Sequence, residues 1–338
     1  MKKLFIIFAI LCLATPAMAA DWNFYGSARF ATFWIDDDPD EADVSSDTDL
    51  QWAQQGNSRI GANVKFNDEI GGRFEMSDSF GKRMLYGTYN FGAGKLLIGQ
   101  TYAPSAIFAS NSVFDGDGDL LGIGEFYEGR LPMIHVGFGG GFELALIKPD
   151  VDGVGDQDLD VNIPKIEAAY TFKTDMFNMK GFAGYHTYEI TQAGVNYDVD
   201  SYVVGIGAGM NFGPVFVNLG AHIGQNLGNY GAYQPYIDQD AGFTATDTLD
   251  NDAFGWLAVV GFNVSEMITL EAGYGYEEAE LDNSNNKQDA QQIYLNATIN
   301  ITKGFFIVPE IGMITISEDA SPEEPERFYA GAKWQINF

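Results

Sequence analysis

Three aspartates alternate with glycines at Asp115, Asp117 and Asp119, and carboxylates at this density could bind a metal ion or face a cluster of basic groups. A calcium loop of the EF-hand type that starts at Asp115 would need Gly at its sixth position and Glu at its twelfth. The chain has Leu120 and Phe126 at those positions, so no EF-hand is predicted. A weaker calcium site, an acidic loop opposed to basic side chains, and a solvated surface loop all stay open.

Side chains for acid–base or nucleophilic catalysis are scarce. The three histidines, His135, His186 and His222, fall in separate predicted strands, and none belongs to a Ser/His motif. The single cysteine, Cys12, lies in an N-terminal segment with the features of a signal peptide. We therefore expect no enzymatic activity, no cofactor and no metal held by cysteine.

Alternation of apolar and polar residues runs through most of the chain and predicts strands rather than helices. In the stretch 326–338, Phe328, Trp334 and Phe338 share one face, while Lys333 and Gln335 lie on the other. This stretch is as long as a tilted strand that crosses a bilayer. Sixteen such strands are predicted, at approximately 22–35, 57–67, 70–80, 82–92, 95–102, 124–138, 141–148, 163–173, 177–190, 199–212, 214–226, 253–264, 267–278, 289–301, 304–317 and 326–338.

Both faces of these strands have to be satisfied, because the apolar face needs lipid and the charged face needs water. An antiparallel barrel around an aqueous lumen meets both demands and leaves no open edge. A soluble β-sandwich shows the same alternation, but its strands are usually only about five or six residues long. The apolar faces are also too many for one sandwich core. The sequence therefore predicts an all-β transmembrane antiparallel barrel in one domain.

The lengths of the connections predict the topology of this barrel. Connections after even-numbered strands are two to four residues long, whereas most of those after odd-numbered strands are long and acidic. Short periplasmic turns and long outer loops are typical of outer-membrane barrels. The predicted outer loops cover residues 36–56, 80–81, 103–123, 149–162, 191–198, 227–252, 279–288 and 318–325.

The N-terminus has the pattern of a signal peptide. Two lysines precede a short apolar run, and small residues at positions 17 and 19 form a cleavage motif. Cleavage after Ala19 or Ala20 would leave residues 1–20 as the signal peptide and residues 21–338 as the barrel.

Composition narrows the class of protein and its partners. Loss of the two N-terminal lysines would change the formal net charge from −29 to −31, which excludes nucleic acid as a partner. Forty glycines and 14% aromatic residues are typical of a barrel with aromatic girdles and closely packed strands. No run of about 18 apolar residues follows the signal segment, so a helical membrane protein is not expected.

Several short motifs resemble those of the Gram-negative general porins, a family of trimeric, sixteen-stranded outer-membrane barrels. The matching motifs are Asn57-Ser58-Arg59-Ile60-Gly61-Ala62, Asp68-Glu69-Ile70-Gly71-Gly72, Lys82-Arg83-Met84-Leu85-Tyr86-Gly87, Gly99-Gln100-Thr101-Tyr102-Ala103-Pro104 and Glu125-Phe126-Tyr127-Glu128-Gly129-Arg130. Their order and spacing match the family over approximately residues 22–140, and the last strand, which ends in Phe338, matches again.

The resemblance implies a constriction inside the barrel. In these porins the third loop, here residues 103–123, folds into the lumen, and its acidic side chains face arginines on the wall. By motif position the basic wall would contain Arg59, Arg83 and Arg130, with Lys82 as a further candidate. The acidic side would contain Asp115, Asp117 and Asp119, with Glu125 and Glu128 as further candidates. Opposed charges across a narrow passage would orient water and dipolar solutes.

Strand alternation supports some of these placements more than others. Arg59 falls on the polar face of its predicted strand, so its side chain is expected in the lumen, as is that of Arg29. Strict alternation puts Lys82 rather than Arg83 on the polar face, and a bulge would be needed to reconcile the two. The strand with Arg130 contains a proline and alternates poorly, so the placement of Arg130 depends on the resemblance.

These patterns predict an outer-membrane channel for passive diffusion of small hydrophilic solutes and ions. The acidic first, third and sixth outer loops favour a preference for cations. A channel specific for a sugar or an organic cation is the main alternative, with Phe108, Phe114, Phe126 and Tyr127 as an aromatic track. A plugged structural barrel is a second alternative.

The expected partners are outer-membrane lipid, lipopolysaccharide, small hydrophilic solutes and other copies of the chain. The resemblance implies a homotrimer, although the second outer loop, which latches onto a neighbouring subunit in this family, is reduced to little more than Gly81. It also implies that the barrel-assembly machinery recognises the last strand through the terminal Phe338.

Overall fold

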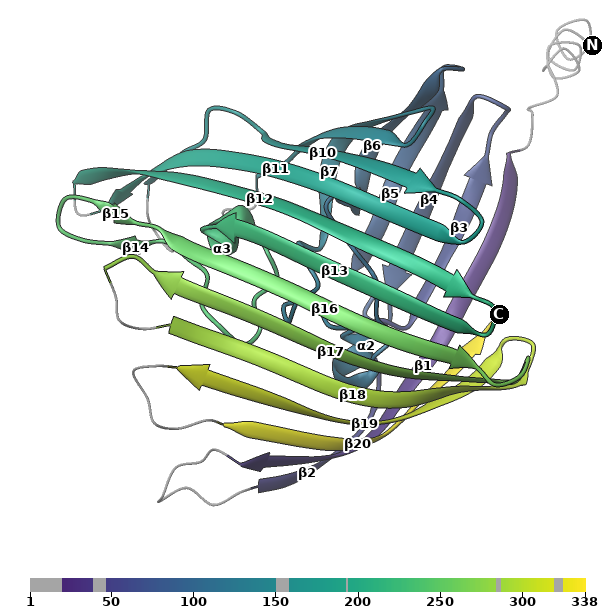
Figure 1. Ribbon diagram of the computed structural model, residues 1–338. Coiled ribbons are helices and arrows are strands. Elements are labelled where there is room, and N and C mark those ends of the chain that lie inside the picture. Colours follow the sequence, from purple (N-terminus) through teal and green to yellow (C-terminus); the bar gives the residue numbers. More distant parts are fainter. Residues whose placement is uncertain (1–19, 39–46, 150–157, 193, 284–286, 319–324) are drawn as a thin grey trace, which may run out of the picture.

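The computed structural model describes residues 20–38, 47–149, 158–192, 194–283, 287–318 and 325–338, and its strands wind into a closed barrel (Figure 1). The strands are β1 (Asp21–Asp38), β2 (Asp47–Gln54), β3 (Arg59–Lys65), β4 (Ile70–Ser77), β5 (Lys82–Asn90), β6 (Gly94–Tyr102), β7 (Arg130–Phe138), β8 (Phe142–Ile147), β9 (Asp158–Asp160), β10 (Lys165–Lys173), β11 (Phe177–Gln192), β12 (Val195–Phe212), β13 (Val215–Gln225), β14 (Gly242–Phe243), β15 (Thr248–Leu249), β16 (Asn251–Asn263), β17 (Ile268–Leu281), β18 (Lys287–Thr302), β19 (Phe305–Glu318) and β20 (Glu326–Asn337). Two short helices, α2 (Phe114–Asp117) and α3 (Leu227–Tyr230), lie in connections. No helix among the described residues has the length and apolar character needed to cross a membrane. The signal peptide predicted at 1–20 lies outside the described residues, apart from Ala20.

Eighteen strands belong to the barrel sheet, and they fill sixteen positions around it. One part of β1 pairs with β3 and the rest pairs with β2, so β2 and β3 follow one another at a single position. The strands β9 and β10 likewise share one position beside β11. The barrel closes where β1 pairs with β20, from Ser27 opposite Asn337 to Asp38 opposite Glu326. The predicted fold class and the predicted number of strands are therefore confirmed.

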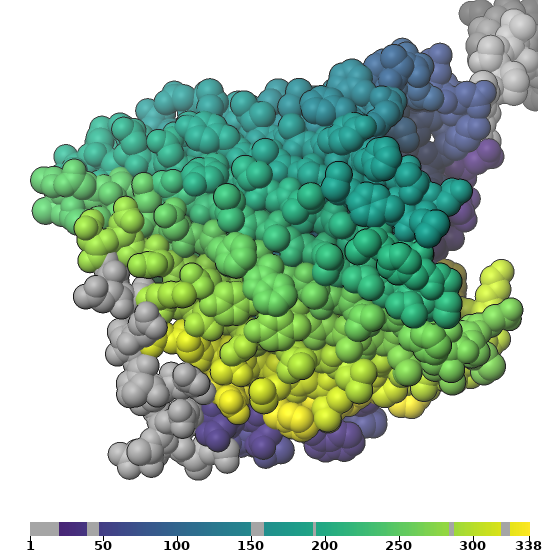
Figure 2. Space-filling model, viewed as in Figure 1, coloured from purple at the N-terminus to yellow at the C-terminus, as the bar shows by residue number. Residues whose placement is uncertain are grey.

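The two faces of the wall differ as the alternation predicts. Along β16, Val260 is 51% exposed on the outer face, while its neighbour Val259 is 1% exposed on the inner face. Figure 2 shows that the side chains of the strands form a continuous outer surface on the side in view. An apolar outer wall of this kind suits contact with lipid hydrocarbon.

Several predicted boundaries differ from the structure. The predicted outer loop at 191–198 is mostly strand, because β11 runs to Gln192 and β12 begins at Val195, and the predicted outer loop at 149–162 contains β9. The predicted strand 124–138 begins only at Arg130, because Gly124 and Gly129 adopt φ angles of 91° and 86°, which interrupt an extended strand. The predicted outer loop at 36–56 contains β2, which extends a hairpin with β1 and places Leu50 and Trp52 on its exposed face. The predicted outer loop at 227–252 contains α3 and the β14–β15 hairpin.

Candidate functional site

The β6–β7 loop (residues 103–129) lies against the buried face of the barrel strands. Four buried wall glutamates accept hydrogen bonds from backbone N–H groups of this loop. The donor and acceptor pairs are Ser105 and Glu167 (2.9 Å), Asn111 and Glu271 (2.7 Å), Val113 and Glu310 (2.7 Å), and Gly124 and Glu277 (2.9 Å). A buried donor without a partner costs about 1–3 kcal/mol. The wall carboxylates therefore supply the hydrogen bonds that a helix or strand would otherwise have provided.

Two glycines allow the backbone of this loop to approach the wall closely. Gly124 has a φ of 91°, and a Cβ at this position would collide with the carbonyl oxygen of Trp256 on β16. On β17, a Cβ at Gly275 would collide with the carbonyl oxygen of Ile123 in the loop. Glycine is needed on both sides of this contact, because any side chain would push the loop away from the wall.

The aspartate run forms a tight turn at α2, near the middle of the loop. Asp115, Asp117 and Asp119 have φ angles of 49°, 62° and 51°, and Gly116 has a φ of 75°. Aspartate and glycine tolerate this left-handed region better than most residues. The alternation of the two residue types therefore builds the turn as well as supplying its carboxylates.

Asp117 joins the loop to the wall on both sides of the barrel closure. Its carboxylate forms ion pairs with Arg29 of β1 and with Lys333 of β20, the latter at 2.9 Å. Asn57 donates an additional hydrogen bond to the same carboxylate at 2.9 Å. Burial raises the pKa of Asp117, but Lys333 and Arg29 outweigh it, so the pKa lies below its ordinary value. The carboxylate is thus held in its charged form.

The other two aspartates of the run have no such partners. Among the described residues, neither Asp115 nor Asp119 belongs to an ion pair. Asp115 is exposed and Asp119 is partly buried. Burial, and then the carboxylates of Glu125 and Asp117, raise the pKa of Asp119 well above its ordinary value.

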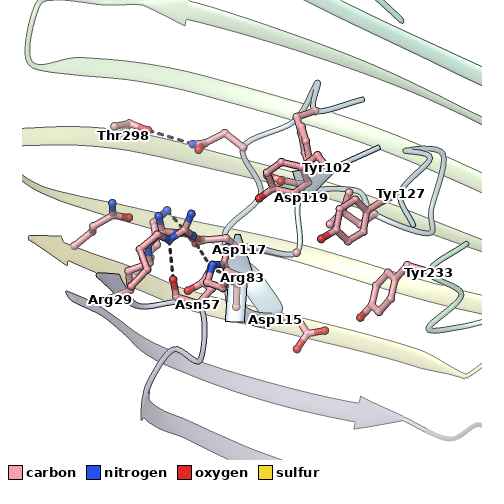
Figure 3. Close-up of a pocket in the computed structure, with 18 of the residues that line it drawn as sticks. Arg29, Asn57, Arg83, Tyr102, Asp115, Asp117, Asp119, Tyr127, Tyr233 and Thr298 are labelled. Atoms are coloured by element: carbon pink, nitrogen blue, oxygen red, sulfur yellow. Dashed lines mark hydrogen bonds and ion pairs between the residues drawn. The ribbon is translucent and has the colours of Figure 1, made fainter. Parts of the chain in front are cut away.

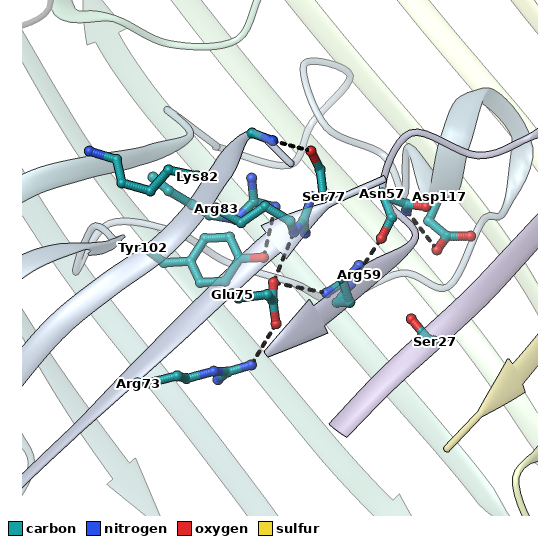
Figure 4. A network of polar contacts seen from close by, with 12 residues as sticks. Ser27, Asn57, Arg59, Arg73, Glu75, Ser77, Lys82, Arg83, Tyr102 and Asp117 are labelled. Carbon is teal, nitrogen blue, oxygen red and sulfur yellow. Dashed lines mark hydrogen bonds and ion pairs between the residues drawn. The ribbon is translucent and has the colours of Figure 1, made fainter. Parts of the chain in front are cut away.

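One wall carboxylate, Glu75 of β4, organises the basic side chains opposite the loop (Figure 4). Its Oε1 atom accepts a hydrogen bond from Arg83 Nε at 2.8 Å and lies 3.6 Å from Arg59 Nη1. Its Oε2 atom accepts hydrogen bonds from Arg73 Nη2 and from the Tyr25 hydroxyl, both at 2.8 Å. Glu75 is completely buried, so three guanidinium groups share one carboxylate. No pattern in the sequence distinguishes Glu75 from the other polar residues of the strands.

A β-bulge settles which of two neighbouring basic residues faces inward. Glu75 is opposite Met84 and Met76 is opposite Lys82, so the register between β4 and β5 shifts by one residue at Arg83. The bulge turns Arg83 toward Glu75. Lys82 is exposed and does not line the cavity between the loop and the wall.

Arg130, the first residue of β7, packs on an aromatic ring. Its guanidinium carbon lies 4.7 Å from the centre of the Tyr102 ring, and its Nη2 atom donates to the Tyr102 hydroxyl at 3.0 Å. Its Nε atom is buried and has no hydrogen-bond partner among the described residues. Arg130 is therefore held in place without a carboxylate.

The two glutamates proposed as further acidic members of the constriction, Glu125 and Glu128, are buried and do not line the cavity. Glu125 accepts hydrogen bonds from the backbone N–H groups of Ala109 and Ser110 in its own loop. Burial raises its pKa to about 7, although these hydrogen bonds oppose the shift. Glu128 forms an ion pair with Lys165 of β10, which is also buried. Both glutamates thus hold the loop in position, because their carboxylates are used within it or at its base.

A second connection, the β13–β16 loop (residues 226–250), also packs on the buried side of the wall. Tyr230 of α3 is completely buried, and its hydroxyl donates to Glu167 at 2.7 Å. The backbone N–H of Tyr233 donates to the carbonyl oxygen of Tyr127 in the β6–β7 loop at 2.7 Å. The two loops are therefore in direct contact.

The inward position of the β13–β16 loop was not predicted. Its sequence carries a signal that could have revealed it, because Leu227, Tyr230 and Ile237 are apolar or aromatic residues in a connection that also contains several aspartates. All three are buried.

A cavity of about 680 Å³ lies between these loops and the wall (Figure 3). Its basic lining residues are Arg29, Arg59, Arg83, Arg130 and Lys333, and its acidic lining residues are Asp115, Asp117 and Asp119. Six of the charged residues proposed for the constriction thus line one cavity, and Arg29, expected in the lumen from alternation, joins them. Lys333 had been placed only on the polar face of the last strand.

The proposed aromatic track divides into two groups. Phe108 and Tyr127 line the cavity. Phe114 stacks on Tyr329 with ring centres 3.9 Å apart, and Phe126 packs on Phe182, so both are buried in the contact between loop and wall. Phe114 and Phe126 do not line the cavity.

The aspartate run does not have the arrangement of a metal site. The described part of the chain contains no group of three or more His, Cys, Asp or Glu side chains that could hold a metal ion. The central carboxylate, Asp117, is already bound to two basic groups.

Comparison with known proteins identifies the family. A family model of Gram-negative porins matches residues 7–315. The chain belongs to this porin family. The porin family and the closed sixteen-stranded barrel together make the protein a multi-pass outer-membrane channel and not an enzyme. The resemblance found in the sequence motifs is confirmed.

Solved porins share this fold at low sequence identity. The outer-membrane channel DcaP of Acinetobacter baumannii is similar, with a TM-score of 0.77 and 18% identity over 94% of this chain and 97% of that one. The trimer form of OmpT of Vibrio cholerae has a TM-score of 0.58 and 14% identity over 94% and 99% of the two chains. OmpF of Salmonella typhi has a TM-score of 0.59 and 14% identity over 93% and 97%. No curated protein matches the chain by sequence.

Proposed function

We propose that this porin forms a water-filled channel for passive diffusion of small hydrophilic solutes and ions, and that the β6–β7 loop folds into its lumen as the constriction. The observation that supports this proposal is the cavity in which aspartates of the loop face arginines of the wall. The basic wall would consist of Arg59, Arg83 and Arg130 with the additional Arg29 and Lys333. The acidic side would consist of Asp115, Asp117 and Asp119.

Charges of opposite sign across a narrow passage create a field perpendicular to the direction of diffusion. Water and dipolar solutes align in such a field, whereas an apolar solute must disrupt the aligned water. The passage would thereby favour small polar molecules without a dedicated site for each one.

A preference for cations would come from the outer loops rather than from the constriction. The cavity itself has five basic and three acidic lining residues. The whole chain carries a formal net charge of −29. Asp238 and Asp247 of the β13–β16 loop and Asp252 at the start of β16 are exposed. Negative potential at the outer mouth would accumulate cations over about one Debye length, which shrinks as salt increases.

A planar-bilayer measurement tests the channel and its selectivity together. The mature protein is refolded, and conductance steps and reversal potentials are recorded under a KCl gradient at low and high salt. We expect large ohmic steps and a reversal potential on the cation side that approaches zero at high salt. An anion-side reversal would overturn the cation preference alone, and correctly folded barrels that do not conduct would support the plugged structural barrel.

We also infer that the chain assembles as a homotrimer embedded in lipid and lipopolysaccharide, because the related OmpT of Vibrio cholerae has been solved in a trimer form. The β4–β5 connection contains Gly81 in place of the long latch found in general porins. Electrophoresis of unheated and heated samples tests the trimer: an oligomer that heating converts to a monomer would support it, and a monomer in both lanes would contradict it.

The two chain ends would guide export and insertion. We infer that residues 1–20 are a signal peptide removed before assembly, which N-terminal sequencing of the mature protein checks. Phe338 exchanges backbone hydrogen bonds with Gly26 of β1 at 2.8 and 3.0 Å, while its ring is exposed. The exposed ring is available for the barrel-assembly machinery, and Phe338→Ala is expected to reduce insertion in cells more than refolding in detergent.

A further inference from the structure

Most charged groups that line the cavity already have an ionic partner. Arg29 and Lys333 are paired with Asp117, and Arg59 and Arg83 are paired with Glu75. These charges set the field of the passage, but a solute would have to compete with a built-in partner for each of them.

Three lining groups remain without an ionic partner. Across the described ranges, Arg130, Asp115 and Asp119 take part in no ion pair. Arg130 also keeps one buried N–H without a hydrogen bond. The cavity therefore offers one unpaired guanidinium and two unpaired carboxylates to whatever enters it.

A row of four aromatic side chains connects these groups. Tyr102, Phe108 and Tyr127 all contact one another, with ring centres 5.1 Å apart for Tyr102 and Phe108, 5.9 Å for Phe108 and Tyr127, and 6.2 Å for Tyr102 and Tyr127. Tyr127 contacts Tyr233 of the β13–β16 loop at 6.4 Å. All four side chains line the cavity, and Phe108 and Tyr233 are 49% and 45% exposed. The row is thus a surface on which a flat ring could stack rather than a buried cluster.

The two ends of the row differ in charge. Arg130 lies on the Tyr102 ring at one end. At the other end, burial and then the nearby Asp115 carboxylate raise the pKa of Tyr233. Tyr127 lies between them: burial raises its pKa, Arg130 lowers it, and Asp119 raises it. Figure 3 shows the aspartates, Tyr102, Tyr127 and Tyr233 around the same space.

We propose that this cavity binds small solutes that carry a flat ring together with one positive and one negative group, of which an aromatic amino acid is the simplest. The solute carboxylate would bind Arg130, its ring would stack on Phe108 and Tyr127, and its ammonium group would face Asp115. The proposal rests on the proposed channel function, because it names the class of solute that the same passage favours.

Binding of this kind is weak enough for transport. Each aromatic contact and each ion pair in contact with water contributes only modestly to binding. A channel needs sites that attract a solute and still release it. The cavity would therefore act as a transient stop along the passage.

Four small probes separate the contributions of the ring and the two charges. L-Phenylalanine has all three features, hydrocinnamate lacks the ammonium group, phenethylammonium lacks the carboxylate, and L-alanine lacks the ring. Each is added to the refolded porin in a planar bilayer, and the concentration that halves the KCl current is measured. We expect L-phenylalanine to need a concentration about fivefold lower than each of the other three.

Variants assign the two ends of the row. Arg130→Gln should weaken the block by L-phenylalanine and by hydrocinnamate about fivefold and leave the block by phenethylammonium unchanged. Asp115→Asn should weaken the block by phenethylammonium and leave the block by hydrocinnamate unchanged. Phe108→Leu should weaken the block by all three ring-bearing probes. Because leucine keeps an apolar side chain at this position, this variant still tests the site if Arg130→Gln does not fold. Lys303→Gln and Asp175→Asn, both in exposed turns, are the matched controls.

Each outcome is decisive. Equal block by hydrocinnamate and L-phenylalanine would overturn the role of the acidic end, and equal block by L-alanine would overturn the role of the rings. Normal conductance that none of the four probes reduces would overturn the binding site and leave the proposed channel intact. A folded barrel without any conductance would overturn the channel itself.

Discussion

Arg83 Nε donates a hydrogen bond of 2.8 Å to Oε1 of Glu75, and the same buried carboxylate holds two further arginines. Removal of its charge would leave one additional positive charge next to the passage. A unit charge about 6 Å away in water changes the energy of a permeant ion by about 0.7 kcal/mol, which corresponds to about threefold in concentration. Because this energy has opposite signs for K⁺ and Cl⁻, we expect Glu75→Gln to lower the permeability ratio of K⁺ to Cl⁻ about tenfold, as measured by the reversal potential.

Glu69→Gln is the control for this change, because Glu69 is exposed in the β3–β4 turn. It removes the same charge far from the arginines. A permeability ratio that changes equally in the two variants would show that Glu75 acts only through total charge and not through its position.

The anchoring of the β6–β7 loop by Glu310 can be tested separately. This carboxylate accepts hydrogen bonds from the Ser112 hydroxyl and from the backbone N–H groups of Val113 and Phe114. Glu310→Ala would leave these donors unsatisfied, at about 1–3 kcal/mol each. We expect faster hydrogen exchange at residues 112–114 and larger fluctuations of the open-channel current. Unchanged exchange, or equal effects in the exposed turn variant Glu266→Ala, would contradict this role.

Alanine substitutions at Gly124 and Gly129 can separate the effect of backbone strain from the effect of close packing against the wall. Gly124 and Gly129 both have a positive φ, so alanine at either position incurs about 1–2 kcal/mol of strain. At Gly124 the added Cβ would also collide with the Trp256 carbonyl oxygen, whereas at Gly129 nothing lies within 4 Å. We expect Gly124→Ala to lower the melting temperature more than Gly129→Ala and to change single-channel conductance. Identical effects of the two substitutions would show that the loop is not packed on β16 as described.

Sequence alternation was sufficient to predict the barrel, because successive side chains of every strand point to opposite faces of the wall. Val259 and Val260 face opposite sides of the wall whatever the rest of the chain does. The same rule placed Arg59 and Arg29 inward, and the structure brings both to the cavity. It failed at Arg83, because a bulge is a property of two paired strands and is not visible in either strand alone.

The rest of the site depends on contacts between distant segments. Glu75 looks like any polar residue of a strand until β3 and β5 bring Arg59 and Arg83 beside it. Glu125 and Glu128 lie next to the aspartate run in sequence, but burial turns them into anchors. Tyr233 joins the cavity only because the β13–β16 loop folds inward. Short-range patterns therefore predicted the strands of the wall and the acidic run. They did not predict which charged side chains are paired with one another and which remain unpaired in the cavity.

The last prediction concerns pH. Burial, and then Glu125 and Asp117, raise the pKa of Asp119 well above its ordinary value of 3.8, so acidification neutralises Asp119 before an ordinary aspartate. Loss of this negative charge should lower the permeability ratio of K⁺ to Cl⁻ about tenfold, because K⁺ and Cl⁻ respond in opposite directions. We expect this fall to begin above the pH range of an ordinary aspartate and to be absent in Asp119→Asn, which starts at the lower ratio.

Glu125 must be separated from this effect, because burial raises its pKa to about 7 and it is buried beside the same turn. Glu125→Gln keeps an acceptor for the backbone of the loop and removes the titration near neutral pH. If Asp119 controls selectivity, Glu125→Gln should retain a pH-dependent permeability ratio, and Asp119→Asn should not. The reverse result would assign the pH dependence to the buried anchor, which would then act by moving the loop rather than by changing the charge of the passage.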